Sequence, residues 1–133
     1  MSDLYSEMIL EYYKNPANKK RLEKPDIYHT AHNPLCGDSC EIFIELDKET
    51  KSKLETFTWD GAGCAISIAS TSILTKLVKD LSLKEVLEFD KDDLLEMLGI
   101  KLSPNRLKCA LLGLDTLKNG IRMHLGGNVE FKE

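Results

Sequence analysis

Three cysteines in three distant segments constrain how this chain can fold. Cys36, Cys64 and Cys109 each stand at a predicted end of a helix or strand. Asp38 follows Cys36 by two residues, so one loop can present a thiolate and a carboxylate to the same ion. Three thiolates and one carboxylate are typical of a metal or metal–sulfur site. Such a site, assembled from distant segments, would exist only in the folded chain.

Length and composition limit the class of protein. With 133 residues and 42% hydrophobic content, the chain suits one domain over residues 1–133. The sequence has no run of eighteen apolar residues, so we expect no membrane span. The N-terminus lacks the pattern of a signal peptide. We therefore expect a cytoplasmic protein whose thiols stay reduced. A net charge of −4 and the lack of an aromatic-interleaved basic patch disfavour nucleic-acid binding.

Hydrophobic periodicity predicts one helix followed by three strands. Residues 3–14 have helical spacing, and Asn15-Pro16 ends that helix. Strand-like patterns follow at 27–32, 40–46 and 53–60, and the polar link 47–52 predicts an antiparallel hairpin. In the last strand, alternation predicts that Glu55, Phe57 and Trp59 share a face. Phe43 breaks the alternation of the middle strand and indicates that its second face is partly covered.

The remaining sequence is helical. An apolar-to-small stripe runs from Cys64 to Leu77. Two shorter helices begin at the capping residues Ser82, with Glu85, and Asp90, and the second ends at Gly99. The last helix begins at Ser103-Pro104, and we expect its buried stripe to be formed by apolar residues at helical spacing: Leu107, Ala110, Leu111, Leu114, Leu117 and Ile121. The predicted fold is α+β, a three-stranded antiparallel sheet with helices packed against it.

The cysteines differ in their predicted surroundings. Cys109 falls off the centre of the apolar stripe, where a structural cysteine would more naturally sit. The nearby helix start and Lys108 both favour its thiolate. Cys64 lies between a predicted strand and a predicted helix. Cys36 is expected in a loop that follows Pro34. Cys40 shares a face with apolar strand residues, so we interpret it as a core residue.

Other metal-site patterns fit less well. His29, His32 and His124 could ligate a metal, although surface or interior positions without a ligand role are the ordinary interpretation for each. The absence of any C-x-x-C pair disfavours a zinc finger and a thioredoxin-type redox site. The residues alone therefore predict metal binding by Cys36, Asp38, Cys64 and Cys109.

These segments resemble the U-type iron–sulfur cluster assembly proteins, the family of IscU, SufU and the N-terminal domain of NifU. The resemblance runs almost end to end. Its motifs are Tyr5-Ser6-Glu7, Tyr12-Tyr13-Lys14-Asn15-Pro16, Asn33-Pro34-Leu35-Cys36-Gly37-Asp38, the stretch 60–70 around Gly63-Cys64-Ala65-Ile66-Ser67, and Lys108-Cys109. The family fold, a three-stranded sheet covered by helices, agrees with the predicted elements.

The resemblance implies a function. In the family, three cysteines and an aspartate hold zinc or a nascent [2Fe–2S] cluster, which matches Cys36, Asp38, Cys64 and Cys109 here. A cysteine desulfurase supplies sulfur as a persulfide, for which Cys109 and Cys36 are the candidate acceptors. The cluster, built from iron and sulfur, passes to apo iron–sulfur proteins. This implies a scaffold rather than an enzyme.

Two departures keep alternatives open. Lys108 stands where the IscU branch has histidine, which resembles SufU, yet the insertion typical of SufU is absent. The stretch Leu102-Ser103-Pro104-Asn105-Arg106 lacks the paired prolines of the IscU branch, so recruitment of a dedicated chaperone is in doubt. The first alternative is a SufU-like zinc-dependent sulfurtransferase with Lys108 as a modulating residue. The second is a structural zinc module that recruits proteins.

Overall fold

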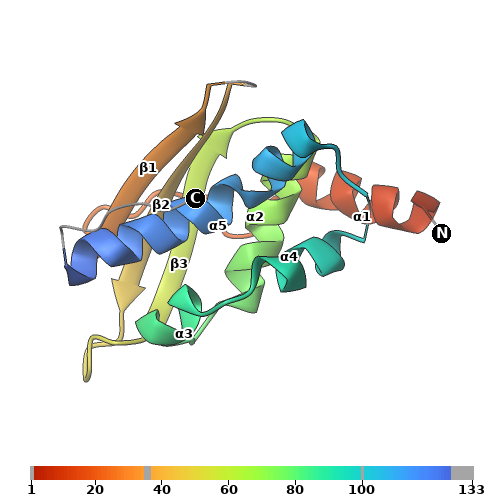
Figure 1. Ribbon diagram of the computed structural model, residues 1–133. Coiled ribbons are helices and arrows are strands. Elements are labelled where there is room, and N and C mark those ends of the chain that lie inside the picture. The colour runs from red at the N-terminus through yellow and green to blue at the C-terminus, as the bar shows by residue number, and fades with distance from the viewer. Residues whose placement is uncertain (1, 35–36, 100, 127–133) are drawn as a thin grey trace.

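The computed structural model describes residues 2–34, 37–99 and 101–126, and it shows a three-stranded antiparallel sheet with helices packed against it (Figure 1). The elements, in chain order, are α1 (Ser2–Lys14), β1 (Ile27–Asn33), β2 (Asp38–Leu46), β3 (Leu54–Ala62), α2 (Ala65–Leu77), α3 (Leu83–Leu87), α4 (Lys91–Leu98) and α5 (Pro104–Leu125). The predicted α+β class and the order of elements are confirmed. Within the described residues, no helix is both long and apolar enough to cross a membrane.

The sheet is a simple meander in the order β1-β2-β3. Ile42 lies opposite both His29 of β1 and Trp59 of β3, and Ile44 lies opposite Phe57. Side chains of one β2 face, from Cys40 to Leu46, are buried. The predicted alternation in β2 is therefore confirmed, and this face forms the floor of the core.

The predicted alternation in β3 is wrong at its first residues. The register shifts between Glu45 and Leu46, so that Leu46 pairs with Leu54. Because of this irregularity, Leu54 is fully buried and Glu55 is exposed, although strict alternation would place Glu55 beside Phe57. Because side chains alternate between the two faces of a sheet, one extra residue in a strand moves the side chains that precede it to the opposite face.

The outer face of the sheet is partly covered, as Phe43 predicted. Phe43 is buried, with the Arg21 guanidinium above its ring and the Tyr28 ring beside it. The polar segment that precedes β1 contacts β3 through Ala17 and Asn18. The Trp59 backbone N–H donates to the Asn18 carbonyl at 3.1 Å, and the Trp59 indole donates to the Ala17 carbonyl at 2.9 Å.

Helix ends follow the capping signals in the sequence. The Ser103 hydroxyl accepts from the Arg106 N–H at the start of α5, and Pro104 occupies the first turn. Both bonds of the capping box between Ser82 and Glu85 are present at α3. Gly99 ends α4 in the left-handed conformation, with φ of 68°.

Helix α2 is buried on more sides than an amphipathic stripe predicts. The excess consists of hydroxyl-bearing residues, whose short side chains satisfy their own hydrogen bonds in the helix interior. The Thr71 hydroxyl donates to the Ser67 carbonyl, and the Thr75 hydroxyl donates to the Ser72 carbonyl. The sequence pattern treats these residues as polar and so underestimates how central α2 is.

The predicted stripe of α5 is confirmed at Ala110, Leu114, Leu117 and Ile121, but the buried face is rotated from the centre of that stripe. Leu107 and Leu111 are only half-buried, whereas Cys109 is 5% exposed and lies on the buried face. The reason is close packing at glycines. A Cβ on Gly113 would lie 2.5 Å from the Thr71 hydroxyl of α2, and one on Gly120 would lie 2.9 Å from the His29 Cβ of β1.

We expect Gly113→Ala to lower the free energy of unfolding by about 1–2 kcal/mol, the balance of overpacking against a gain in helix propensity. Urea denaturation measures the change. The double variant Gly113→Ala/Thr71→Ala removes the colliding side chain and should recover part of the loss. If the single variant is more stable than the wild type, the close approach of α5 to α2 described here is wrong.

Candidate metal centre

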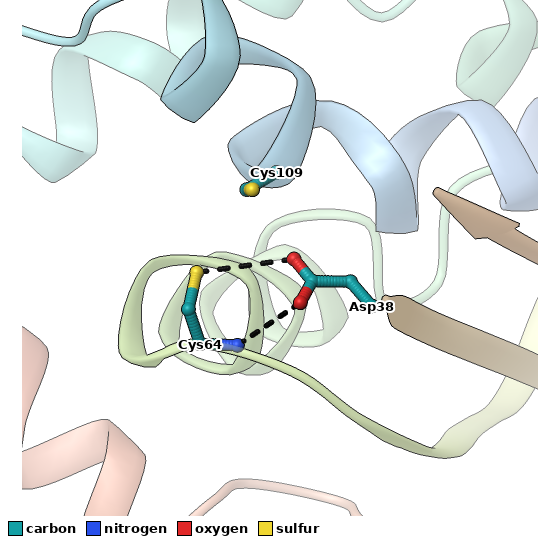
Figure 2. Close-up of side chains that lie close together, drawn as sticks. All are labelled: Asp38, Cys64 and Cys109. Atoms are coloured by element: carbon teal, nitrogen blue, oxygen red, sulfur yellow. Dashed lines mark hydrogen bonds between the residues drawn. The ribbon is translucent and has the colours of Figure 1, made fainter. Parts of the chain in front are cut away.

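Three side chains from three elements meet at one end of the sheet (Figure 2). Asp38 extends from the first residue of β2, Cys64 precedes α2, and Cys109 lies in the second turn of α5. One ligand atom from each lies within 4.8 Å of the others. Asp38 is 2% exposed and Cys109 is 5% exposed. The fold therefore gathers three of the four residues that the sequence predicts as ligands.

The Asp38 carboxylate accepts two hydrogen bonds at the start of helix α2. Cys64 is the N-cap residue of α2, and its own side chain caps no backbone N–H. Instead, the Cys64 N–H donates to Asp38 Oδ1 at 3.2 Å, and the Cys64 thiol donates to Asp38 Oδ2 at 3.8 Å. A carboxylate at this end of a helix is stabilised by the free N–H groups and the helix dipole. One side chain thus serves as cap and candidate ligand.

Glycine at position 63 makes room for this carboxylate. A Cβ on Gly63 would lie 2.8 Å from Asp38 Cγ and 2.4 Å from the Ser67 hydroxyl. Gly61, with φ of 153°, lies against the Ser39 carbonyl, which a Cβ would approach to 2.3 Å. The glycines that flank Cys64 in the sequence therefore permit the close approach of β2 to the start of α2.

The other residues considered as metal ligands either lie away from this group or fall outside the described residues. Cys36 falls outside the described residues. Cys40 is buried in the core, where burial raises the pKa of its thiol to about 12, so it is a poor metal ligand. Neither His29 nor His32 joins Asp38 in a potential metal-binding group within the described part of the chain.

A cavity of about 400 Å³ opens over Asp38, Cys64 and Cys109. Its lining also includes Asn33, at the end of β1, and Arg106. Lys108 lines a neighbouring groove rather than this cavity, and among the described residues that line the cavity the cation is Arg106. The sequence pointed to Arg106 only together with Lys108, as a likeness to SufU, and to Asn33 only as part of the Cys36 motif; it predicted neither as a residue that lines the site.

The donor set suits zinc or iron. Thiolate sulfur and carboxylate oxygen are ordinary ligands of both metals, and a tetrahedral zinc with Zn–S bonds of about 2.3 Å separates its ligand atoms by roughly 3.7 Å. Cys64 and Asp38 already approach this separation. The site would close by a small inward movement of its side chains, without rearrangement of the sheet.

The fold and the site together define a small α+β protein in which two thiols and a carboxylate could hold a metal ion. The chain belongs to the family described as the NifU-like N terminal domain, whose model matches residues 4–130. It is 31% identical to the zinc-dependent sulfurtransferase SufU of Bacillus subtilis, with 96% of each chain covered. It is also 31% identical to the iron–sulfur cluster assembly scaffold protein IscU 1 of Archaeoglobus fulgidus, with 89% of this chain and 74% of the relative covered.

A solved structure shares this fold. A candidate iron–sulfur cluster assembly scaffold of the SUF system from Fervidobacterium islandicum superimposes with a TM-score of 0.75 at 25% identity, covering 89% of this chain and 96% of that one. The resemblance seen in the sequence motifs is therefore confirmed, as is the expected three-stranded architecture.

Removing the Asp38 carboxylate should destabilise the metal-free protein. We expect Asp38→Ala to lower the free energy of unfolding by about 1 kcal/mol, the usual cost of losing a helix cap. Asp38→Asn keeps an oxygen acceptor for the Cys64 N–H and serves as the matched control. Urea denaturation in the presence of a chelator measures both variants. Equal stability of Asp38→Ala and the wild type would show that α2 does not depend on this bond.

Proposed function

We propose that the chain is a scaffold on which an iron–sulfur cluster is assembled and then passed to apo-proteins. The observation that supports this most directly is the convergence of Asp38, Cys64 and Cys109 at one end of the sheet. Relatives named IscU scaffold proteins belong to the same family. Cluster assembly is therefore the function that we propose for this set of thiols and carboxylate.

In this proposal Cys36 completes the ligand set. It is two residues from Asp38 and adjoins Gly37, which lines the cavity. Asp38 makes the set suitable for release, because a carboxylate oxygen binds a cluster iron more weakly than thiolate sulfur does. Four thiolates would favour storage, whereas three thiolates and a carboxylate leave one position exchangeable.

Sulfur would arrive from a cysteine desulfurase. A thiolate of this chain attacks the outer sulfur of the partner's cysteine persulfide, and the partner's thiolate leaves, so the transfer needs no external oxidant. Conversion of that sulfur to the sulfide of a cluster takes two electrons, which excess cysteine would supply as it is oxidised to cystine. We propose Cys109 as the acceptor for cluster assembly because the start of α5 favours its thiolate. Cys36 is the acceptor in the alternative function below.

The alternative is zinc-dependent sulfur transfer, which would make the protein an enzyme. The full-length similarity to SufU favours it. That alignment spans 145 positions, more than the 133 residues of this chain, so the relative has residues with no counterpart here. In this alternative zinc is a resident ion held by the same four residues, and the chain supplies the accepting thiolate.

Anaerobic reconstitution tests the scaffold. The protein is incubated with ferrous iron, cysteine and a desulfurase, and the iron and acid-labile sulfide per chain are measured. We expect near-equal amounts of both, and we expect Cys64→Ser and Cys109→Ser to bind much less, because serine is a poor cluster ligand. Cys40→Ser is the matched control, since Cys40 lies in the core away from the cavity.

Other outcomes would contradict the scaffold. Retained zinc without labile sulfide, together with a persulfide on Cys36 or Cys109 detected by mass spectrometry, would establish sulfur transfer. Zinc whose removal unfolds the protein, with no persulfide on any cysteine, would indicate a structural zinc module.

Charge at the site gives Arg106 a role in either function. Three thiolates and one carboxylate around a divalent ion leave a net charge of about −2. Of the described residues that line the cavity, Arg106 alone is cationic. Its guanidinium would offset this charge, together with the N-terminal ends of α2 and α5.

We expect Arg106→Ala to weaken zinc binding by up to about fivefold at low ionic strength and less at high salt, as for other solvent-exposed charges. Lys108→Ala is the control, because Lys108 lines the neighbouring groove. Competition with a chelating dye at two salt concentrations measures both affinities. A larger loss in Lys108→Ala than in Arg106→Ala would return the modulating role to Lys108.

A further inference from the structure

A separate cavity, of about 410 Å³, lies at the end of α2 that is farther from the cysteines. Leu77 at the C-terminal end of α2, Phe89 between α3 and α4, and Met97 of α4 form its apolar lining. Asp93 and Glu96 of α4 complete it. Cys64 precedes the first residue of α2, so the length of this helix, roughly 20 Å, separates the cavity from the candidate metal centre.

Helix α4 presents three of these residues on one face. Asp93, Glu96 and Met97 are spaced as i, i+3 and i+4, and all three are exposed. Another face of α4, with Leu94 and Leu98, is fully buried, and α4 packs against α2 (Figure 1). Met97 is 46% exposed although its side chain is apolar. Its flexible thioether can adapt to an incoming side chain.

The cavity has a fixed wall. Lys118 of α5 donates to the Phe89 carbonyl at 2.6 Å, which holds the link between α3 and α4 from the inner side. Asp90 and Gly99 cap the two ends of α4. The cavity is therefore formed before any partner arrives, which lowers the cost of binding.

The negative charge of the chain is concentrated around this cavity. Residues 85–98 contain six carboxylates, all exposed, and one lysine. Their net charge is −5, whereas the whole chain carries −4, so the rest of the protein is close to neutral. The ion pairs among the described residues use other carboxylates, those of Asp26, Glu41 and Asp60. Of the described residues that line the cavity, none is cationic.

The competing explanation for these charges is the dipole of α4. Asp92 and Asp93 lie in its first turn, where carboxylates are stabilised. Glu96, however, lies in the last turn, where a negative charge is unfavourable and no basic residue offsets it. Glu96 also follows Asp92 by four residues and Asp93 by three, so like charges repel it. A carboxylate that its own helix disfavours points to a contact outside the chain.

We propose that this cavity is a docking site for a basic segment of a partner protein, in which a large apolar side chain is flanked by lysine or arginine. The apolar side chain would lie among Leu77, Phe89 and Met97, as an anchor residue does at an interface. The flanking cations would pair with Asp93 and Glu96, which supplies specificity.

Other occupants fit this charge less well. Nucleic acids and anionic membrane surfaces would be repelled by it. A second copy of the chain, related by a two-fold axis, would bring the same carboxylates against one another. A partner bound at this end of α2 leaves the cysteines at the other end accessible, so the proposal does not rest on the function proposed above.

Titration of ¹⁵N-labelled protein with synthetic peptides at low ionic strength tests the proposal. The probe is a short peptide in which one leucine is flanked on both sides by lysines. Its control keeps the lysines and replaces the leucine by glycine. We expect saturable shifts of the Phe89 and Met97 amide signals with the probe, and about tenfold weaker binding of the control, because burial of the leucine contributes to affinity.

Reversal of the charge separates docking from folding. Asp93→Lys/Glu96→Lys should weaken binding of the probe about tenfold at low salt and create binding of a peptide with glutamates in place of the lysines. The urea midpoint should stay near that of the wild type, since the loss at the start of α4 is offset by the gain at its end. The matched control is Glu23→Lys/Glu49→Lys, two exposed carboxylates outside residues 85–98.

Three results would overturn the proposal. Shifts that rise linearly with the probe and never saturate would show that there is no site. Equal affinity of the probe for Asp93→Lys/Glu96→Lys and the wild type, or equal affinity of the two peptides, would show that the charges or the apolar lining take no part. Shifts of Phe89 and Met97 when the protein alone is concentrated would identify a second copy of this chain as the occupant instead.

Discussion

The hydrogen bonds between Asp38 and Cys64 connect the fold to the site. In these bonds Asp38, the first residue of β2, accepts from the N-cap residue of α2, and the same carboxylate lies beside the cysteines. The position of Asp38 over Gly63 allows the sheet and the helix to approach without a long connection. A metal bound to Asp38 would share this carboxylate with the start of α2. Loading of the site and the stability of its central helix are therefore coupled through one side chain.

Most of the fold could be predicted from the sequence because its signals are local. The caps at Ser82, Ser103 and Gly99 occur where the sequence placed them, since each depends on a few neighbouring residues. The irregularity beside Glu55 could not be predicted, because it depends on which residue of β2 lies opposite. Likewise, the rotation of α5 depends on where Gly113 and Gly120 meet other elements.

The sequence predicted that Asp38, Cys64 and Cys109 would lie together, but it did not predict their environment, and the predicted ligand Cys36 lies outside the described residues. Asp38, Cys64 and Cys109 converge as expected. Cys109, however, was expected off the centre of the apolar stripe, and it lies well within the buried face. Helical periodicity finds the apolar side of a helix, but it does not show that Cys109 lines a cavity beside Asp38 and Cys64. Arg106 and Asn33 show the same limit, because only the folded chain places them beside the cysteines.

The hydrogen bonds between the segment around Asn18 and β3 affect how molecules of this protein can associate. An exposed strand edge is a template on which a second chain can add its own strand, and this is a common route to aggregation. Here Trp59 pairs with Asn18 and Leu54 pairs with Asp80 and Leu81, which leaves only a short gap at Phe57. The positive charge of Lys20 and Lys79 beside that gap discourages entry by another copy of the same edge. Polar residues that look like a plain surface loop in the sequence thus help to keep the protein from polymerising through its sheet.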